Sequence, residues 1–387
     1  MVYRVKGVNP EMIKWAREDA GYSLDDLPEY LSKAKSWESG EITPTWADLR
    51  KLAKKYNRPP IFYLMSKPPS NQHDGIIEFR SNDKVKDYSP ELRLEIRKAK
   101  FRRNSLLDFN IGLNFPLLNF SKNVHEKNNL NVSDLSSQIR DFLGVDLKLQ
   151  SSWSKNSNGD RVSNHSTFLY EWKEIFFDLG ILVFETEKVA EKEMSGLSLY
   201  FENYPIILLN GKNSHNRRIF TLMHELAHLF MGGSAICDID KHNKKETFCN
   251  KVAAEVLVPL NSLTRDLVFY KNGNINSSKI SNYYGVSKEV CFYRLFEKKF
   301  ISEDKLNKEI SVIEEKNREK MEKKRLNYKK SKGGGLSLVA KKKKYEGKPF
   351  MRFLLNAYEN ELISPVKFMK TADISIDYVN SLNDEMW

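Results

Sequence analysis

Two histidines four residues apart, with a glutamate after the first, form the clearest chemical signal in this 387-residue chain. His224, Glu225 and His228 make an H-E-x-x-H motif inside residues 216–231, where hydrophobic residues recur at helical spacing. Residues i and i+4 share one face of a helix, so both imidazoles can bind a single Zn²⁺ ion. Glu225 points to the side of that ion and can take a proton from an activated water molecule. The motif therefore predicts a zinc-dependent hydrolytic site.

A catalytic zinc site of this kind needs a third protein ligand, which should come from a second helix. Residues 246–258 supply that helix, since their pattern is helical and a proline follows them. Glu246 and Glu255 are its acidic candidates, and Cys249 is a soft-ligand alternative that fits a buried structural cysteine better. A pair of alanines in the helix allows it to cross the first one closely.

The residues around both helices resemble the ImmA/IrrE metallopeptidase family. The likeness rests on Arg-x-Phe-Thr-Leu-x-His-Glu-Leu-x-His-Leu at 218–229, then on Glu-x-x-x-Asn and Ala-Ala-x-x-Leu-x-Pro. In that family the glutamate four residues before the asparagine is the third ligand, which implies Glu246, four before Asn250. Glu255 would then be a surface or supporting residue. The resemblance further implies a cytoplasmic, regulatory endopeptidase whose protein substrate is a helix-turn-helix transcriptional repressor.

The segments around the motif predict an α+β fold that is mostly helical, with a zincin-like core of a small sheet and the H-E-x-x-H helix. A helix ending at Gly180 precedes strands at 181–184, 197–201 and 205–209. In the resembled family the strand before the metal helix is an edge strand, so residues 205–209 would accept an extended peptide through main-chain hydrogen bonds. The candidates for the donor that stabilises the reacting carbonyl oxygen are Tyr200, Tyr204, His215 and Arg217.

The N-terminal residues 1–68 resemble the XRE-type helix-turn-helix domain. The likeness rests on Ala-Arg and Ala-Gly in a first helix and on Trp-Glu-Ser-Gly at 37–40. A second helix is expected over 23–31, although Pro28 would kink it. Only five residues separate its end from the Trp-Glu-Ser-Gly turn, which is too short for a full DNA-reading helix. The domain is therefore predicted to have a truncated recognition helix and to serve packing or protein docking.

The chain divides further by composition. Residues 69–165 are expected to be a connector and a helical region, and residues 166–312 the peptidase core, ending in helices that resemble a helix-turn-helix unit. Residues 313–348 are expected to be a basic flexible linker, and 349–387 a small helical module.

The formal net charge of +12 is concentrated in two segments. Residues 314–348 carry a net charge of +9 and residues 80–103 a net charge of +5, which leaves −2 for the rest of the chain. Both segments are candidates for non-specific contact with nucleic-acid phosphates. Three cysteines without a Cys-x-x-Cys pair fit a reducing cytoplasm, and the short apolar runs predict no membrane span.

A second functional class also fits the sequence. The chain could be a DNA- or protein-binding regulator, such as a toxin–antitoxin or phage-defence component, with weak or no proteolysis. The short recognition helix argues against its DNA-binding form.

Overall fold

The computed structural model describes residues 3–68, 88–113, 120, 131–155, 165–232, 235–236, 244–270, 273–330 and 337–386. The chain forms two compact units, Met1–Lys98 and Ala99–Trp387, and the division falls inside helix α4 (Pro90–Leu113). Each unit has a hydrophobic core of its own. Residues 69–87, at the start of the expected connector, lie outside the described residues.

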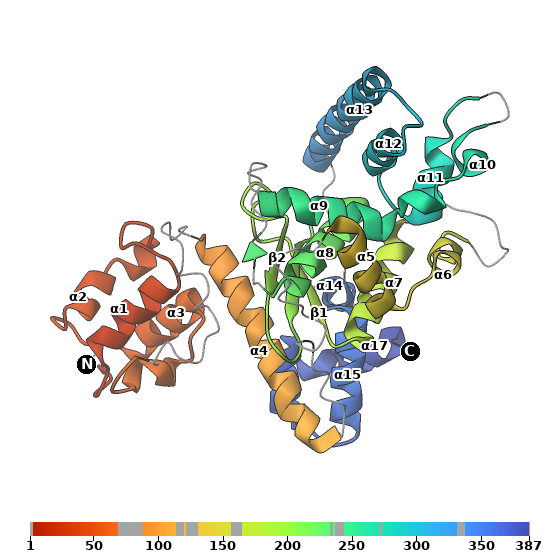
Figure 1. Cartoon of the computed structure of the whole chain (residues 1–387). Coiled ribbons are helices and arrows are strands. Elements are labelled where there is room, and N and C mark those ends of the chain that lie inside the picture. Colours follow the sequence, from red (N-terminus) through yellow and green to blue (C-terminus); the bar gives the residue numbers. More distant parts are fainter. Residues whose placement is uncertain are drawn as a thin grey trace. The chain divides into compact units, whose positions relative to one another are not determined.

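The first unit is a small helical bundle (Figure 1). Its elements are α1 (Pro10–Asp19), η1 (Glu29–Leu31), α2 (Ala34–Glu38), α3 (Trp46–Tyr56) and η2 (Pro60–Leu64). Buried aliphatic and aromatic residues from all of them form its core. The start of α3 has a capping box, which explains why the chain turns sharply into this helix.

The helix expected over residues 23–31 is absent, and that prediction was wrong. Only the short 3₁₀ turn Glu29–Leu31 follows Pro28, because proline lacks the N–H that a helix interior needs. Helix α2 has 5 residues, fewer than two turns, which agrees with the expected shortness of this region. Glu38 at its end accepts two hydrogen bonds from the buried guanidinium of Arg17. The assignment of this unit as a helix-turn-helix domain stays a prediction.

The second unit contains a mixed four-stranded sheet in the order β1-β3-β2-β4. Its strands are β1 (Leu182–Thr186), β2 (Gly196–Leu199), β3 (Ile206–Asn210) and β4 (Ala235–Ile236). Strand β3 runs parallel to β1 and antiparallel to β2, and β4 pairs antiparallel with β2. The first three strands are buried along their whole length, which explains why their sequences are mostly apolar.

The predicted edge position of strand 205–209 was wrong. Strand β3 lies between β1 and β2, so both of its sides are paired and no peptide can add to it. Among the described residues, the outer side of β2 pairs with β4 at Leu197 and Ser198. Sequence order does not reveal strand order, because strand pairing is a long-range choice.

Helices cover the sheet and enclose the main hydrophobic core. Helix α8 (His215–Phe230) packs against β2 and β3, while α9 (Lys244–Leu257) packs against α8 and against α5 (Val132–Leu143). Helix α7 (His165–Asp178) packs against α8 and β1 (Figure 1). The predicted α+β fold, mostly helical with a small sheet and the H-E-x-x-H helix, is confirmed.

The helices that follow α9 pack against one another in chain order. They are α10 (Arg265–Val268), α11 (Ser277–Tyr284), α12 (Lys288–Glu297) and α13 (Glu303–Lys330), while α6 (Leu147–Ser152) contacts α11. The C-terminal elements are α14 (Leu338–Tyr345), α15 (Lys348–Glu359), α16 (Pro365–Ala372), η7 (Ile376–Tyr378) and α17 (Val379–Met386).

The predicted flexible linker over 313–348 was wrong where the structure describes it. Residues 313–330 continue helix α13, and most of residues 338–345 form α14. Lys342 is buried beside Glu346, and Lys344 pairs with Glu187. Part of the lysine run therefore attaches the C-terminal helices to the core. Within the described residues, no helix has the length and apolar character that crossing a membrane requires.

Candidate metal site

Helix α8 carries the H-E-x-x-H motif and is anchored at its start. The hydroxyl of Ser214 caps it by accepting a hydrogen bond from the N–H of Arg217. One residue later, Arg218 forms a buried ion pair with Glu185 of β1, which also pairs with Lys173 of α7 at 3.3 Å. These contacts fix the helix against the sheet and against α7.

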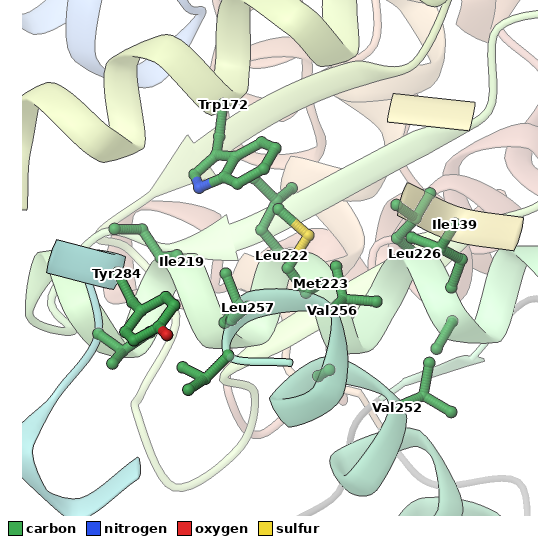
Figure 2. Close-up of a cluster of buried hydrophobic side chains, with 14 of the residues drawn as sticks. Ile139, Trp172, Ile219, Leu222, Met223, Leu226, Val252, Val256, Leu257 and Tyr284 are labelled. Carbon is green, nitrogen blue, oxygen red and sulfur yellow. The ribbon is translucent and has the colours of Figure 1, made fainter. Parts of the chain in front are cut away.

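Close packing between α8 and α9 brings the third acidic residue to the motif. Leu222, Met223 and Leu226 of α8 lie against Val252 and Val256 of α9, with Trp172 on the other side of the cluster (Figure 2). Small side chains on α9 permit this approach, as the sequence predicts. The first turn of α9 therefore places Glu246 beside the two histidines.

His224, His228 and Glu246 converge on one point. The Nε2 atoms of the two histidines are 3.0 Å apart. Nε2 of His224 lies 3.1 Å from Oε2 of Glu246, and Nε2 of His228 lies 3.3 Å from its Oε1. Both imidazoles are buried, while the carboxylate is partly accessible. Among the described residues, these three form the one group of His, Cys, Asp and Glu side chains able to hold a metal ion.

This donor set fits a small divalent cation. Ligand atoms at ~2.0–2.1 Å from a tetrahedral ion lie about 3.4 Å from one another, close to the separations between these three side chains. Two imidazole Nε2 atoms that face each other at 3.0 Å also need a shared proton or a cation between their lone pairs. Two imidazoles and one carboxylate are a common ligand set of catalytic zinc sites.

Electrostatics favours a cation at the same point. Burial alone would raise the pKa of Glu246, but hydrogen bonds from His224 and His228 outweigh it and hold that pKa well below its usual range. Burial alone would lower the pKa of His224, and the contact with Glu246 together with the charge of Glu225 raises it instead. The carboxylate is therefore ionised and attracts positive charge, either as a proton on an imidazole or as a metal ion.

Asn250 supports His224 from the far side of the ring. Its Oδ1 lies 2.9 Å from Nδ1 of His224, so the imidazole donates its Nδ1–H there and keeps Nε2 free as a ligand. Asn250 lies one turn after Glu246 on α9, and both side chains point to the same histidine. The sequence pattern contained this asparagine, yet its role emerges only from the contact.

Glu225 lies buried between α8 and β2. Its carboxylate oxygens have no hydrogen-bond partner of ordinary geometry among the described residues, although the hydroxyl of Ser198 is near enough to favour ionisation. Burial dominates and raises the pKa of Glu225, while His224 and His228 act in the opposite direction. A buried carboxylate with free lone pairs next to a metal group is suited to accept a proton.

Gly196 allows β2 to approach this carboxylate. A Cβ atom at Gly196 would lie 2.3 Å from Cγ2 of Thr221 and 3.0 Å from Oε1 of Glu225. Any side chain would therefore push the strand away from α8. Gly196 and Ser198 are not among the site residues predicted from the sequence. A glycine directly before the apolar strand expected at 197–201 was the one signal that could have pointed to them.

The other ligand candidates lie outside the metal group. The carboxylate of Glu255 pairs with Arg294 of α12 and accepts a hydrogen bond from the N–H of Leu260. Cys249 is fully buried, and burial raises the pKa of its thiol to about 12. A protonated, buried thiol behaves as a core residue.

The four candidates for stabilising the carbonyl oxygen occupy different environments. Tyr204 is buried and Tyr200 partly buried, whereas His215 and Arg217 are exposed in the first turn of α8. The guanidinium of Arg217 donates to the hydroxyl of Ser195 at 3.0 Å. The role of all four stays a prediction.

Comparison with known proteins gives one match. The family model of the IrrE N-terminal-like peptidase domain matches residues 178–296, less than a third of the chain. No curated protein and no solved structure matches the chain. The matched segment includes all four strands and the helices α8 and α9. Residues 178–296 are therefore similar to the IrrE N-terminal-like domain, as the resemblance of the motifs predicts.

Proposed function

We propose that this protein is a zinc-dependent endopeptidase. One observation carries the proposal: His224, His228 and Glu246 converge within hydrogen-bonding distance, next to the buried carboxylate of Glu225. The family match over residues 178–296 supports peptidase chemistry for the segment that contains these residues. The ligand set favours zinc among divalent ions, because imidazole and carboxylate together suit this borderline cation.

The chain's own residues perform the proton transfers. When bound, zinc supplies a Lewis acid that polarises the peptide carbonyl and lowers the pKa of water. A carboxylate oxygen of Glu225 accepts a proton from the attacking water and afterwards gives it to the departing amine. Burial keeps competing water from this carboxylate, and its raised pKa brings it closer to the range where it can both take and release a proton.

We further propose that the substrate is a protein, and specifically a helix-turn-helix transcriptional repressor. This part rests on the resemblance of the motifs to peptidases that cleave such repressors. The partly accessible Glu246 shows that solvent reaches the ligand group from the start of α9, where a peptide could approach. Regulation of transcription, or of a stress or phage response, in the cytoplasm is part of the same proposal.

The test compares the wild-type chain with Glu225→Gln. Zinc analysis of both purified proteins should give about one ion per chain, because Glu225 is not a ligand. An unbiased search for cleaved proteins in native cytosol should find fragments with the wild type and none with the variant. A Glu225→Gln variant that still cleaves would disprove the assigned base.

A second pair of variants distinguishes the loss of a metal ligand from the loss of the catalytic base. Glu246→Gln removes the carboxylate ligand, so we expect it to lose both zinc and cleavage. Glu255→Gln changes a glutamate of the same helix that pairs with Arg294 instead, and it should keep zinc. If Glu255→Gln lost the metal and Glu246→Gln kept it, the ligand assignment would be wrong.

A further inference from the structure

The side chain of Arg103 in α4 donates hydrogen bonds to the turn that joins β2 to β3. Its Nε donates to the carbonyl oxygens of Asn203 at 3.1 Å and Tyr204 at 3.0 Å, and its Nη2 donates to Asn203 at 2.6 Å. The guanidinium carbon also lies 3.8 Å from the ring centroid of Phe201. One side chain thus contacts three residues of the turn, Phe201, Asn203 and Tyr204.

This arginine is half-buried among carbonyl groups and not beside an acid. Among the described residues, no carboxylate forms an ion pair with Arg103, and its one other hydrogen bond goes to the amide oxygen of Asn104. Burial lowers the pKa of Arg103 to about 10. A desolvated cation is unfavourable unless its hydrogen bonds are satisfied, so the turn carbonyls are the partners that keep it there.

The turn itself is under local constraint. Tyr204 has a φ of 54°, in the left-handed region that non-glycine residues seldom adopt. Its neighbour Glu202 accepts a hydrogen bond from the N–H of Phe120 at 2.7 Å. A backbone conformation of this kind persists where surrounding contacts enforce it. Arg103 supplies three of those contacts.

The constrained turn directly follows the strand that approaches the carboxylate of Glu225, the candidate base. Strand β2 ends at Leu199, just before the turn, and its residues Gly196 and Ser198 approach the carboxylate of Glu225. A Cβ at Gly196 would already be too close, so the strand has little room to move toward α8. The spacing between β2 and Glu225 depends on where the end of β2 is held.

We propose that Arg103 is a positioning residue, which holds β2 at the distance from α8 that orients Glu225. This inference rests on the proposed peptidase function. Arg103 lies outside residues 178–296, so the site of the matched domain depends on a helix that the family model does not include. The helix α4 is thereby part of the working peptidase and not only a connector.

The adjacent residue offers a matched control. Arg102 is buried on α4, and its guanidinium pairs with Glu346 before the C-terminal helix α15. Arg102→Met should destabilise the chain without touching the β2–β3 turn, since Lys342 remains beside Glu346. Arg103→Met removes the hydrogen bonds to the carbonyl groups of the turn. Arg103→Lys keeps a cation that can reach one carbonyl.

The first measurement needs no peptidase activity. In hydrogen–deuterium exchange of the full zinc-loaded chain, Arg103→Met should speed amide exchange in residues 196–206 by about tenfold and leave α8 unchanged. Arg102→Met should leave 196–206 as in the wild type. Unchanged exchange in Arg103→Met, or equal acceleration in both variants, would overturn the proposal.

The second measurement separates positioning from general loss of stability. Once a cleaved substrate has been identified, Arg103→Met should lower kcat by about tenfold with little change in KM. The reason is that a displaced base slows the chemical step. Arg103→Lys should recover part of kcat, and bound zinc should stay at the wild-type level in all variants. A kcat that is unchanged while exchange rises would refute the link to Glu225. If the wild type cleaves nothing, the proposed function fails, and exchange alone decides whether Arg103 holds β2.

Discussion

Nδ1 of His224 lies 2.9 Å from Oδ1 of Asn250, and the same helix places Glu246 one turn earlier against the other ring nitrogen. The imidazole is thus held between two residues of α9. Its Nε2 lone pair is directed to the metal point before any ion arrives, which reduces the free energy needed to order the site on metal binding.

Replacing Asn250 by Ala should therefore weaken metal binding. Loss of a supporting hydrogen bond to a metal-bound histidine lowers affinity by about 10- to 100-fold. Competition with a chromophoric zinc chelator measures this change. Asn250→Asp keeps an acceptor oxygen at the same place and should retain most of the affinity. Equal affinities for the Ala variant and the wild type would show that the contact does not orient His224.

Gly196→Ala should destabilise the fold and impair the site. The new Cβ would lie 2.3 Å from Cγ2 of Thr221, so β2 or α8 must shift. Overpacking of this kind costs about 1–3 kcal/mol in the free energy of unfolding, which urea titration measures. The double variant with Thr221→Ser removes the clashing methyl group and should recover part of that loss. No recovery would mean that the contact with Glu225, at 3.0 Å, controls the spacing instead.

Glu185→Gln should be strongly destabilising. This buried carboxylate faces Arg218 of α8 and Lys173 of α7, and its neutralisation leaves two cations without their partner. Breaking a buried ion pair costs about 3–5 kcal/mol. Glu174→Gln is the control, because Glu174 pairs with the partly exposed Arg352 and its loss should cost less than ~1 kcal/mol. Similar urea midpoints for both variants would contradict the structural role of Glu185.

Cys249 and Cys291 should resist alkylation in the folded protein. Both are fully buried, and burial raises the pKa of Cys249 to about 12 and raises that of Cys291 as well. At about pH 9 both thiols should stay protonated, whereas an ordinary thiol would react readily. Mass spectrometry after iodoacetamide treatment tests this in a Cys237→Ser background. Urea should expose both thiols, and rapid labelling of the native chain would show that the α8–α9 core opens.

The exposed part of α13 should account for non-specific binding to nucleic acid, if the protein binds it. Lys316, Arg318, Lys320 and Lys323 are exposed on this helix, and no ion pair is seen for these four among the described residues. Changing these four to Gln should weaken binding to a DNA duplex and reduce the slope of log K against log salt by about 0.9 per lost phosphate contact. Changing Lys342 and Lys344, which are ion-paired, should alter the slope less.

The same binding experiment tests the rival regulatory function. Sequence-specific binding that survives the α13 changes would point to the first unit as a DNA reader. That outcome would contradict the interpretation of the short helix α2 as a docking or packing element.

The ligand histidines could be predicted from the sequence because their relation is local. Helical geometry alone places residues 224 and 228 on one face, and the helical spacing of apolar residues around them predicts the helix. The choice of Glu246 over Glu255 came from family resemblance, and spacing alone could not make it. In the structure the two glutamates lie on different sides of α9, one facing His224 and the other Arg294.

What the sequence by itself determined is the chemistry of the motif, the helices that carry it and the mostly helical class of the fold. Only the tertiary structure decided that β3 is central, that Gly196 and Ser198 approach Glu225, and that Arg103 holds the turn after β2. The reason is physical: helix periodicity arises between residues within one turn, whereas strand order and buried polar contacts join residues far apart in the chain. Such contacts depend on how all elements pack together, and many pairings satisfy the same local pattern.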